Sequence, residues 1–169
     1  MPAPAAGTYP VYFARYINLV DANSVAEAIE KYSSAIINFI KNIPIEKVDY
    51  RYAEGKWSIK EMLQHMIDTE RIFAYRALRI SRHDSTPLPG FDENTYAVAS
   101  NASARSSQNL LNEFEAVRKS TDLLLESLTP DHLNQTGTTD DQPNTSNAIS
   151  FMIFGHLLHH INILKERYL

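Results

Sequence analysis

Three of the six histidines occupy positions that helical periodicity would give to core aliphatic residues. His65 lies three residues after Met62 and directly before Met66, in one apolar stripe. His156 and His160 continue a second stripe, at a spacing of four residues. Four residues advance a helix by about 400°, so these two rings project from one side, a turn apart. The pattern therefore predicts that three buried imidazoles from two helices meet at one point.

Metal binding is the chemistry that this arrangement favours. A lone core histidine is usually just a hydrogen-bonded residue, but three buried imidazoles are costly unless something uses their lone pairs. A divalent cation uses all three, and three neutral histidines leave at least one coordination position open, as catalytic sites do. The ion would lower the pKa of a water or thiol and create a nucleophile near neutral pH. Three imidazoles suit Zn, Ni, Cu and Fe alike.

Other polar residues near these histidines have simpler alternatives. His159 either competes with His160 for the ligand role or lies at the edge of the stripe as a hydrogen-bonding neighbour, and we favour the edge. Asp68, three residues after His65, is the candidate carboxylate for orienting an imidazole or acting as a general base, although a salt bridge is its simpler role. Glu61 is better explained by helix capping.

Three further charged residues of this segment are expected on a solvated or interhelical ionic face: Glu70, Arg71 and Arg76.

Composition excludes several classes of protein. The chain has no cysteine, so its metal ligands must be His, Asp, Glu or water, and any reactive thiol must come from a substrate. A formal charge of −4 without a run of basic residues argues against nucleic-acid binding. No apolar stretch approaches the roughly 20 residues that a membrane span needs, and the first residues do not resemble a secretory signal. We therefore expect a cytoplasmic protein. Phosphate-binding loops and nucleophile elbows are also absent from the sequence.

Four proline-free stretches with helical apolar periodicity must position these side chains: 24–42, 58–82, 107–128 and 146–168. Each helix would bury its stripe against the others, which predicts an all-α fold, a four-helix bundle. The 169 residues fit a single domain, 1–169, in which 1–20 form an N-terminal extension. The long connections 83–106, with a short helix over 93–100, and 129–145 are expected to cover one end of the bundle.

Local signals set the helix starts. Ser58 and Glu61 form an S-x-x-E capping box. Ser146 or Asn147 is expected to cap the last helix. Gly155, the one glycine inside a helix, permits either close helix packing or room for an ion.

At this point the chain resembles a known family. The segments KWSIKEMLQHMIDTE (56–70), LPGFDENTYA (88–97) and GHLLHHINILKERYL (155–169) resemble the DinB-like superfamily. These are metal-dependent four-helix-bundle proteins that include thiol transferases of the bacillithiol and mycothiol type. The order W-S-x-x-E-x-x-x-H on the second helix, then G-H-x-x-H-H on the fourth, carries the resemblance, which extends from about residue 24 to the end.

The resemblance implies an up-down-down-up bundle with long connecting loops. It also implies a divalent metal, most often nickel or zinc, held by one histidine of the second helix and an H-x-x-x-H pair of the fourth. Carried over to this sequence, the ligands are His65, His156 and His160. Many relatives are homodimers, which we expect here too. The resemblance does not define a substrate.

Three functions follow as expectations. The first is a metal-dependent enzyme that activates a thiol or water at an open three-His site, as a thiol S-transferase or a hydrolase of small molecules. Its partners would be a small-molecule substrate and a low-molecular-weight thiol, with no nucleic acid and no membrane. The alternative is a non-catalytic metal-binding or stress-related helical module, and a metal-free scaffold is the third possibility.

Overall fold

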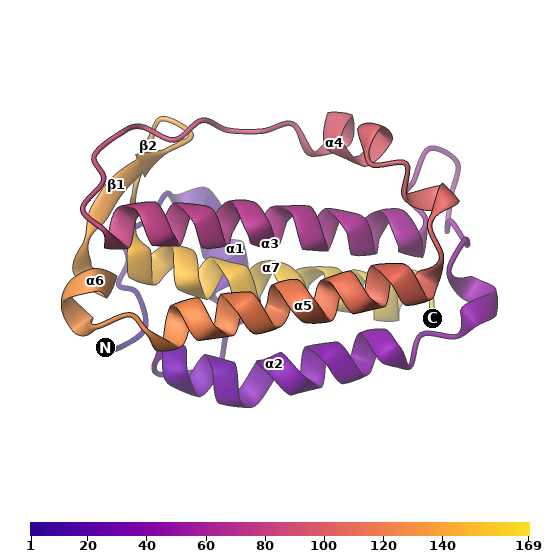
Figure 1. Cartoon of the computed structure of the whole chain (residues 1–169), viewed down its shortest axis with the longest axis horizontal. Coiled ribbons are helices and arrows are strands. Elements are labelled where there is room, and N and C mark those ends of the chain that lie inside the picture. The colour runs from indigo at the N-terminus through magenta and orange to yellow at the C-terminus, as the bar shows by residue number, and fades with distance from the viewer.

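Four long helices form a bundle in the computed structural model, which describes all 169 residues. They are α2 (Val25–Lys41), α3 (Ile59–Ser81), α5 (Ser107–Glu126) and α7 (Ser146–Arg167). Figure 1 shows α2 and α7 running in one direction and α3 and α5 in the other, which is the up-down-down-up order. The all-α four-helix fold is confirmed. None of the helices combines the length and apolar character that crossing a bilayer requires.

Shorter elements join the long helices. Besides 3₁₀ turns at Val11–Phe13, Ile45–Lys47 and Ala102–Ala104, they are α1 (Ala14–Ile17), α4 (Glu93–Ala99), α6 (Pro130–Asn134), β1 (Thr136–Thr139) and β2 (Gln142–Thr145). The strands β1 and β2 pair antiparallel as a hairpin. The short helix expected over 93–100 is present as α4.

The hairpin and α6 were not predicted, because 129–145 was interpreted as a polar loop. Strands as short as TGTT and QPNT have no apolar alternation that could reveal them. The turn between them contains Asp140 and Asp141, which both have positive φ, 52° and 57°. Two successive left-handed residues match the twist of a tight hairpin.

The segment 82–106 runs along the bundle instead of covering one end. Because α3 and α5 are parallel, the chain must return over the length of α3 before α5 can begin, and Figure 1 shows this crossover segment beside α3. The hairpin anchors it: the Leu88 amide donates to the Thr138 carbonyl and the Asp140 amide donates to the Leu88 carbonyl, both at 2.9 Å. The crossover segment and the hairpin therefore form one continuous cover.

All four long helices contribute to one core. Its cluster holds 30 buried apolar residues, among them Ile36, Met66, Leu110 and Phe154. Because the stripes interrupted by histidine belong to this same core, the bundle itself brings α3 and α7 together at the histidine positions.

A buried ionic network crosses the core between helices. Arg118 is completely buried, with Nη1 3.0 Å from Oε1 of Glu70 and Nη2 2.7 Å from Oδ1 of Asp122. The Ser33 hydroxyl donates to the same Asp122 oxygen at 2.9 Å. Burial raises the pKa of the Glu70 carboxyl, and the Arg118 charge opposes this effect. The network links α2, α3 and α5, so Glu70 lies on an interhelical ionic face as expected.

Helix caps follow the sequence with one correction. The Ser58 amide donates to Glu61 Oε2 at 2.6 Å and the Glu61 amide donates to Ser58 Oγ at 3.3 Å, which confirms the capping box. At α7 the cap is Thr145, not Ser146 or Asn147: its side chain accepts an amide hydrogen bond at 3.1 Å. Thr145 ends β2 with the extended backbone that an N-cap needs, so the helix starts as soon as the strand ends.

Replacement of Arg118 tests the buried network. Arg118→Met keeps much of the side-chain volume but leaves Glu70 and Asp122 without their cation, so we expect a loss of about 3–5 kcal/mol in the free energy of unfolding. Urea denaturation measures it. The control is Arg82→Met, at the exposed end of α3, which should change stability by no more than about 0.5 kcal/mol. Equal effects of the two variants would contradict the assignment.

Candidate metal centre

The structure brings His65, His156 and His160 together as a buried cluster. The Nε2 atom of His65 lies 3.0 Å from Nε2 of His156 and 3.2 Å from Nε2 of His160, and the last two atoms are 3.0 Å apart. One ring comes from α3 and two from successive turns of α7.

Hydrogen bonds alone cannot satisfy this triangle of nitrogens. In a neutral imidazole, Nε2 is either a donor or an acceptor. With three mutually close Nε2 atoms, at least two must be of the same kind, so one pair faces lone pair to lone pair or hydrogen to hydrogen. A divalent cation bound by all three removes the conflict. Tetrahedral bonds of about 2.0–2.1 Å place ligand nitrogens about 3.3 Å apart, close to the spacing observed here.

The protonation states suit a cation. Burial lowers the pKa of His65 to about 4, and it lowers the pKa values of His156 and His160 well below the usual range. Neighbouring imidazoles lower the last two further. All three rings are therefore neutral at pH 7, with lone pairs available to a metal.

Thr69 occupies the position from which His65 can be oriented. Its Oγ1 lies 3.5 Å from Nδ1 of His65, one helical turn away, and the Thr69 side chain is buried. A hydroxyl there can accept the Nδ1 hydrogen that a ring ligating through Nε2 carries. The sequence alone did not single out Thr69, although the i, i+4 spacing from His65 is a signal that could have found it.

Asp68 does not face the three imidazoles. Its Oδ1 accepts a hydrogen bond from Gln64 at 2.9 Å and lies 3.9 Å from Nη1 of Arg71. It borders a separate surface hollow beside Tyr96. The structure therefore gives it the salt-bridge role that the sequence analysis considered simpler.

A cavity of about 560 Å³ opens beside the histidine cluster. This volume lies within the range of small-molecule sites, about 300–1,000 Å³. Three groups besides the cluster line it: aromatic rings, two arginines and two carboxylates. They come from Tyr12, Phe13, Arg15, Tyr16, Trp57, Phe73, Arg76, Phe91, Glu93 and Asp140, with Thr69, Gly90 and His159 completing the wall. A small molecule can thus approach the three imidazoles.

Aromatic rings surround the imidazoles. The Trp57 ring centre lies 4.8 Å from that of His65, and the Phe73 ring meets His156 edge-on at 5.9 Å. Trp57 also forms part of the wall of the cavity. Such walls limit the water around the imidazoles and strengthen electrostatic interactions there.

The N-terminal segment also belongs to the site. A Cβ atom on Gly155 would lie 2.2 Å from the backbone oxygen of Tyr16, so the missing side chain lets α1 lie directly on α7. This close packing, rather than room for an ion, is what Gly155 provides. The Tyr16 ring then contacts His156 and His159 edge-on, at 5.7 and 5.2 Å between ring centres. Nothing in the sequence connected residues 11–17 with the histidines.

His159 lies at the edge of the stripe, the position favoured from the sequence. It is half-buried, lines the cavity and does not belong to the cluster of three. Burial and the charge of Arg15 lower its pKa.

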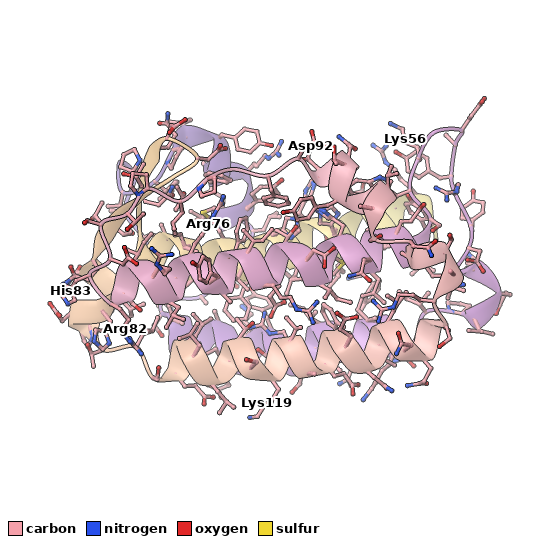
Figure 2. The ribbon with its side chains drawn as sticks, turned by 45° about the horizontal axis from the view of Figure 1, so that its top comes forward. Lys56, Arg76, Arg82, His83, Asp92 and Lys119 are labelled. Carbon is pink, nitrogen blue, oxygen red and sulfur yellow. The ribbon has the colours of Figure 1, made fainter.

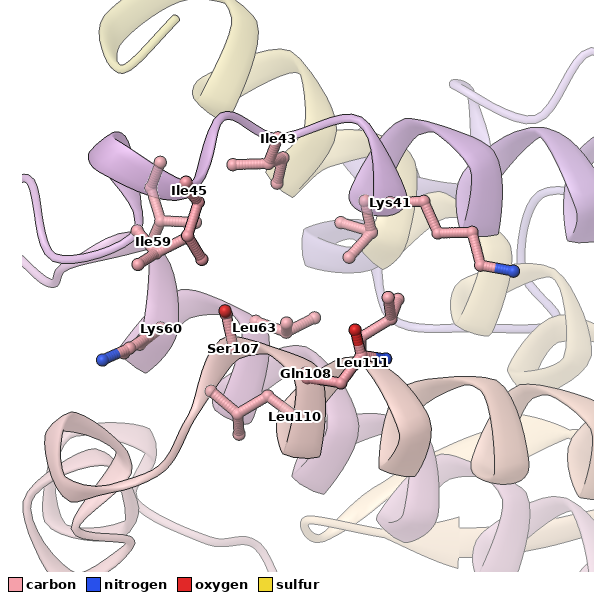
Figure 3. A pocket seen from close by; sticks show the side chains of 12 residues that line it. Lys41, Ile43, Ile45, Ile59, Lys60, Leu63, Ser107, Gln108, Leu110 and Leu111 are labelled. Carbon is pink, nitrogen blue, oxygen red and sulfur yellow. The ribbon is translucent and has the colours of Figure 1, made fainter.

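A second, smaller cavity has no such chemistry. Figure 3 shows it between the end of α2 and the first turns of α3 and α5, with a volume of about 190 Å³. Isoleucine and leucine form most of its wall, and Lys41 and Lys60 are its only titratable residues. It offers no side chain suited to hold a divalent metal.

Comparison with known proteins agrees with this fold. The family model described as the DinB superfamily matches residues 28–164. The chain therefore belongs to the DinB superfamily, and the resemblance noted in the sequence is confirmed.

One curated relative and two solved structures extend the comparison. A protein of Oceanobacillus iheyensis, provisionally named a metal-dependent hydrolase, is 24% identical over 83 residues, which are 48% of this chain and 47% of the relative. The match thus spans about half the length of that relative.

The solved structures share the fold at low sequence identity. YfiT from Bacillus subtilis, described as a probable metal-dependent hydrolase with an unusual four-helix bundle topology, gives a TM-score of 0.69 at 15% identity over 96% of this chain and 89% of its own. The mycothiol-dependent maleylpyruvate isomerase gives 0.66 at 12% identity over 89% of this chain and 59% of its own.

Substitution of Gly155 tests the docking of α1. In Gly155→Ala the new methyl group meets the Tyr16 backbone, so overpacking should cost about 3 kcal/mol, of which about 1 kcal/mol is returned by the higher helix propensity of alanine. We expect a net loss of about 2 kcal/mol by urea denaturation and faster tryptic cleavage after Arg15. Asn162→Ala, exposed on α7, is the control and should leave both unchanged. An unaltered cleavage rate in Gly155→Ala would show that α1 is not held by this contact.

Proposed function

We propose that this protein is a metal-dependent hydrolase of small molecules, with His65, His156 and His160 as the ligands of a divalent ion. The observation that carries the proposal is the triangle of Nε2 atoms, 3.0–3.2 Å apart, in the wall of an open cavity of about 560 Å³. The names of the Oceanobacillus relative and of YfiT support the same class of reaction. Nickel or zinc is the ion we propose, and a homodimer the assembly, both from the family resemblance.

The residues of the chain have separate roles in this proposal. When bound, the ion supplies Lewis-acid activation of a water molecule. Burial keeps the three ligand rings neutral, so no proton has to leave before they bind a cation. Thr69 holds the His65 ring through Nδ1. Trp57 and Phe73 exclude bulk water from the rings and offer apolar surface to a substrate.

Thiol transfer is the second candidate. The chain has no cysteine, so a thiol nucleophile would have to enter the cavity as a cosubstrate. A solved neighbour with the same fold is mycothiol-dependent. The chemistry at the ligands would be similar, because a bound metal lowers the pKa of a thiol as it does that of water.

Metal content provides the first test. Protein purified without a nickel column should contain about one divalent ion per chain by elemental analysis, and His160→Ala should contain almost none, because two imidazoles bind far more weakly than three. His83→Ala is the matched control: His83 is exposed and lies outside the cluster. Equal metal content in wild type and His160→Ala would refute the ligand assignment.

The same proteins distinguish the reactions. Hydrolysis of p-nitrophenyl acetate should require both metal and His160. Transfer of glutathione to monobromobimane, with the same dependence but without ester hydrolysis, would favour the thiol transferase. A metal-loaded protein that accelerates neither reaction would favour the non-catalytic metal-binding module.

The role of Thr69 is tested against that of Asp68. Thr69→Val removes the hydroxyl beside His65 Nδ1 while keeping the shape of the side chain, so metal affinity should fall by about 10–100-fold. Asp68→Asn should bind metal as wild type does, because Asp68 contacts Gln64 instead of an imidazole. Competition with a chromogenic chelator measures both affinities. The reverse order of effects would restore Asp68 as the orienting residue.

A further inference from the structure

Arg76 is a buried guanidinium in the wall of the histidine cavity. Only 4% of the residue is exposed, and Figure 2 shows its side chain rising from α3 toward the crossover segment. It makes one hydrogen bond, from Nη2 to the carbonyl oxygen of Pro89 at 2.7 Å. A guanidinium carries five N–H donors, so most of its donor capacity is unused. Arg76 therefore lies on neither the solvated face nor the interhelical ionic face that the sequence analysis expected.

Two other arginines that join helices of the bundle have carboxylate partners. Arg118 pairs with Glu70 and Asp122 in the core, and Arg71 pairs with Glu113 of α5. Arg76 forms no salt bridge. Burial lowers its pKa, because it disfavours the cationic form. A buried cation without a partner is costly, and such groups are retained where something else supplies the opposite charge.

Asp140 is the carboxylate whose charge acts on Arg76, yet the two form no ion pair. Asp140 is exposed in the hairpin turn and packs against Gly90. A Cβ atom added to Gly90 would lie 2.3 Å from Oδ1 of Asp140. Glu93, also exposed, is the other carboxylate that lines the cavity. These two negative charges disfavour a multiply charged anion such as phosphate more than a single carboxylate.

We propose that Arg76 binds a carboxylate at one end of an elongated substrate whose opposite, reacting end lies at the three histidines. This inference rests on the proposed function and defines its substrate class: an ester, amide or similar compound that carries a free carboxylate several bonds from the bond that is broken. Arg76 supplies a planar, bidentate donor pair that matches a carboxylate.

The elongated shape follows from the position of Arg76 on α3, about three helical turns after His65. Phe73 lies between the two ends: its ring centre is 5.9 Å from the Arg76 guanidinium carbon and 5.9 Å from the His156 ring. An apolar chain therefore lies against Phe73, with polar groups at both ends.

The test uses probes with a metal-binding end. Suberic acid monohydroxamate and its carboxamide analogue differ only in the terminal carboxylate, and both carry a hydroxamate that chelates divalent metals. Calorimetry on the metal-loaded wild type should show tighter binding of the acid by about tenfold or more. In Arg76→Met the ratio of the affinity for the acid to the affinity for the carboxamide should fall to near one. Arg82→Met, which removes an exposed arginine of the same segment, should keep the wild-type ratio.

A second pair of probes separates this inference from the metal proposal. Octanoate and octanamide carry no metal-binding hydroxamate, so a preference for octanoate that disappears in Arg76→Met supports the carboxylate site whatever the metal content. Failure of the metal proposal would appear as equal affinity of the acid hydroxamate and octanoate for the wild type.

Three results would overturn the carboxylate site. One is that the wild type binds the acid and the amide of each probe pair with equal affinity. Another is that Arg76→Met keeps the acid-to-amide affinity ratio of the wild type. The third is a lower melting temperature in both Arg76→Met and Asp140→Asn with unchanged acid-to-amide affinity ratios. That result would show that Arg76 and Asp140 stabilise the fold instead of binding a ligand. If Arg76→Met does not fold, Arg76→Lys keeps the charge without the planar fork and should still reduce the ratio.

Discussion

The contact among three neutral imidazoles inside an apolar bundle is the interaction on which the site depends. Their Nε2 atoms lie 3.0–3.2 Å apart, and no set of tautomers gives every pair a donor and an acceptor. The core must hold this unfavourable triangle in place. It does so because α3 and α7 share one apolar cluster, in which His65, His156 and His160 interrupt stripes that are otherwise aliphatic or aromatic. The folding energy of the bundle thus preorganises lone pairs for a cation.

The long helices and the inward position of each histidine could be predicted because their signals are local, whereas the meeting of His65 with the two α7 histidines followed from the bundle and the family resemblance. The third long helix, expected over 107–128, is Ser107–Glu126, and the capping box at Ser58 starts α3 where the sequence places it. Periodicity alone assigned both His156 and His160 to the inner face of the last helix. The directions of the helices could not be predicted from periodicity, since amphipathic stripes do not specify how helices connect. The up-down-down-up order came from the family resemblance.

Features that depend on contacts between distant segments could not be predicted in this way. The approach of α1 to α7 requires the backbone of Tyr16 to meet Gly155, and a sequence with one helical glycine does not identify its neighbour. Arg76 was assigned to an ionic face because an arginine on a helix usually has a nearby carboxylate. Its burial against Pro89 arises only when the crossover segment returns along α3. The short polar strands likewise lacked the alternation that reveals longer ones.

The cluster of possible metal ligands contains three atoms and no fourth. Asp68 is held by Gln64 on another face, and His159 lies against Tyr16 at the edge of the stripe. Three imidazoles would hold a divalent cation and leave it at least one coordination position for water or substrate, the property that separates catalytic from structural sites. Burial keeps the three rings neutral, and the crossover segment and α1 form walls of the cavity beside them.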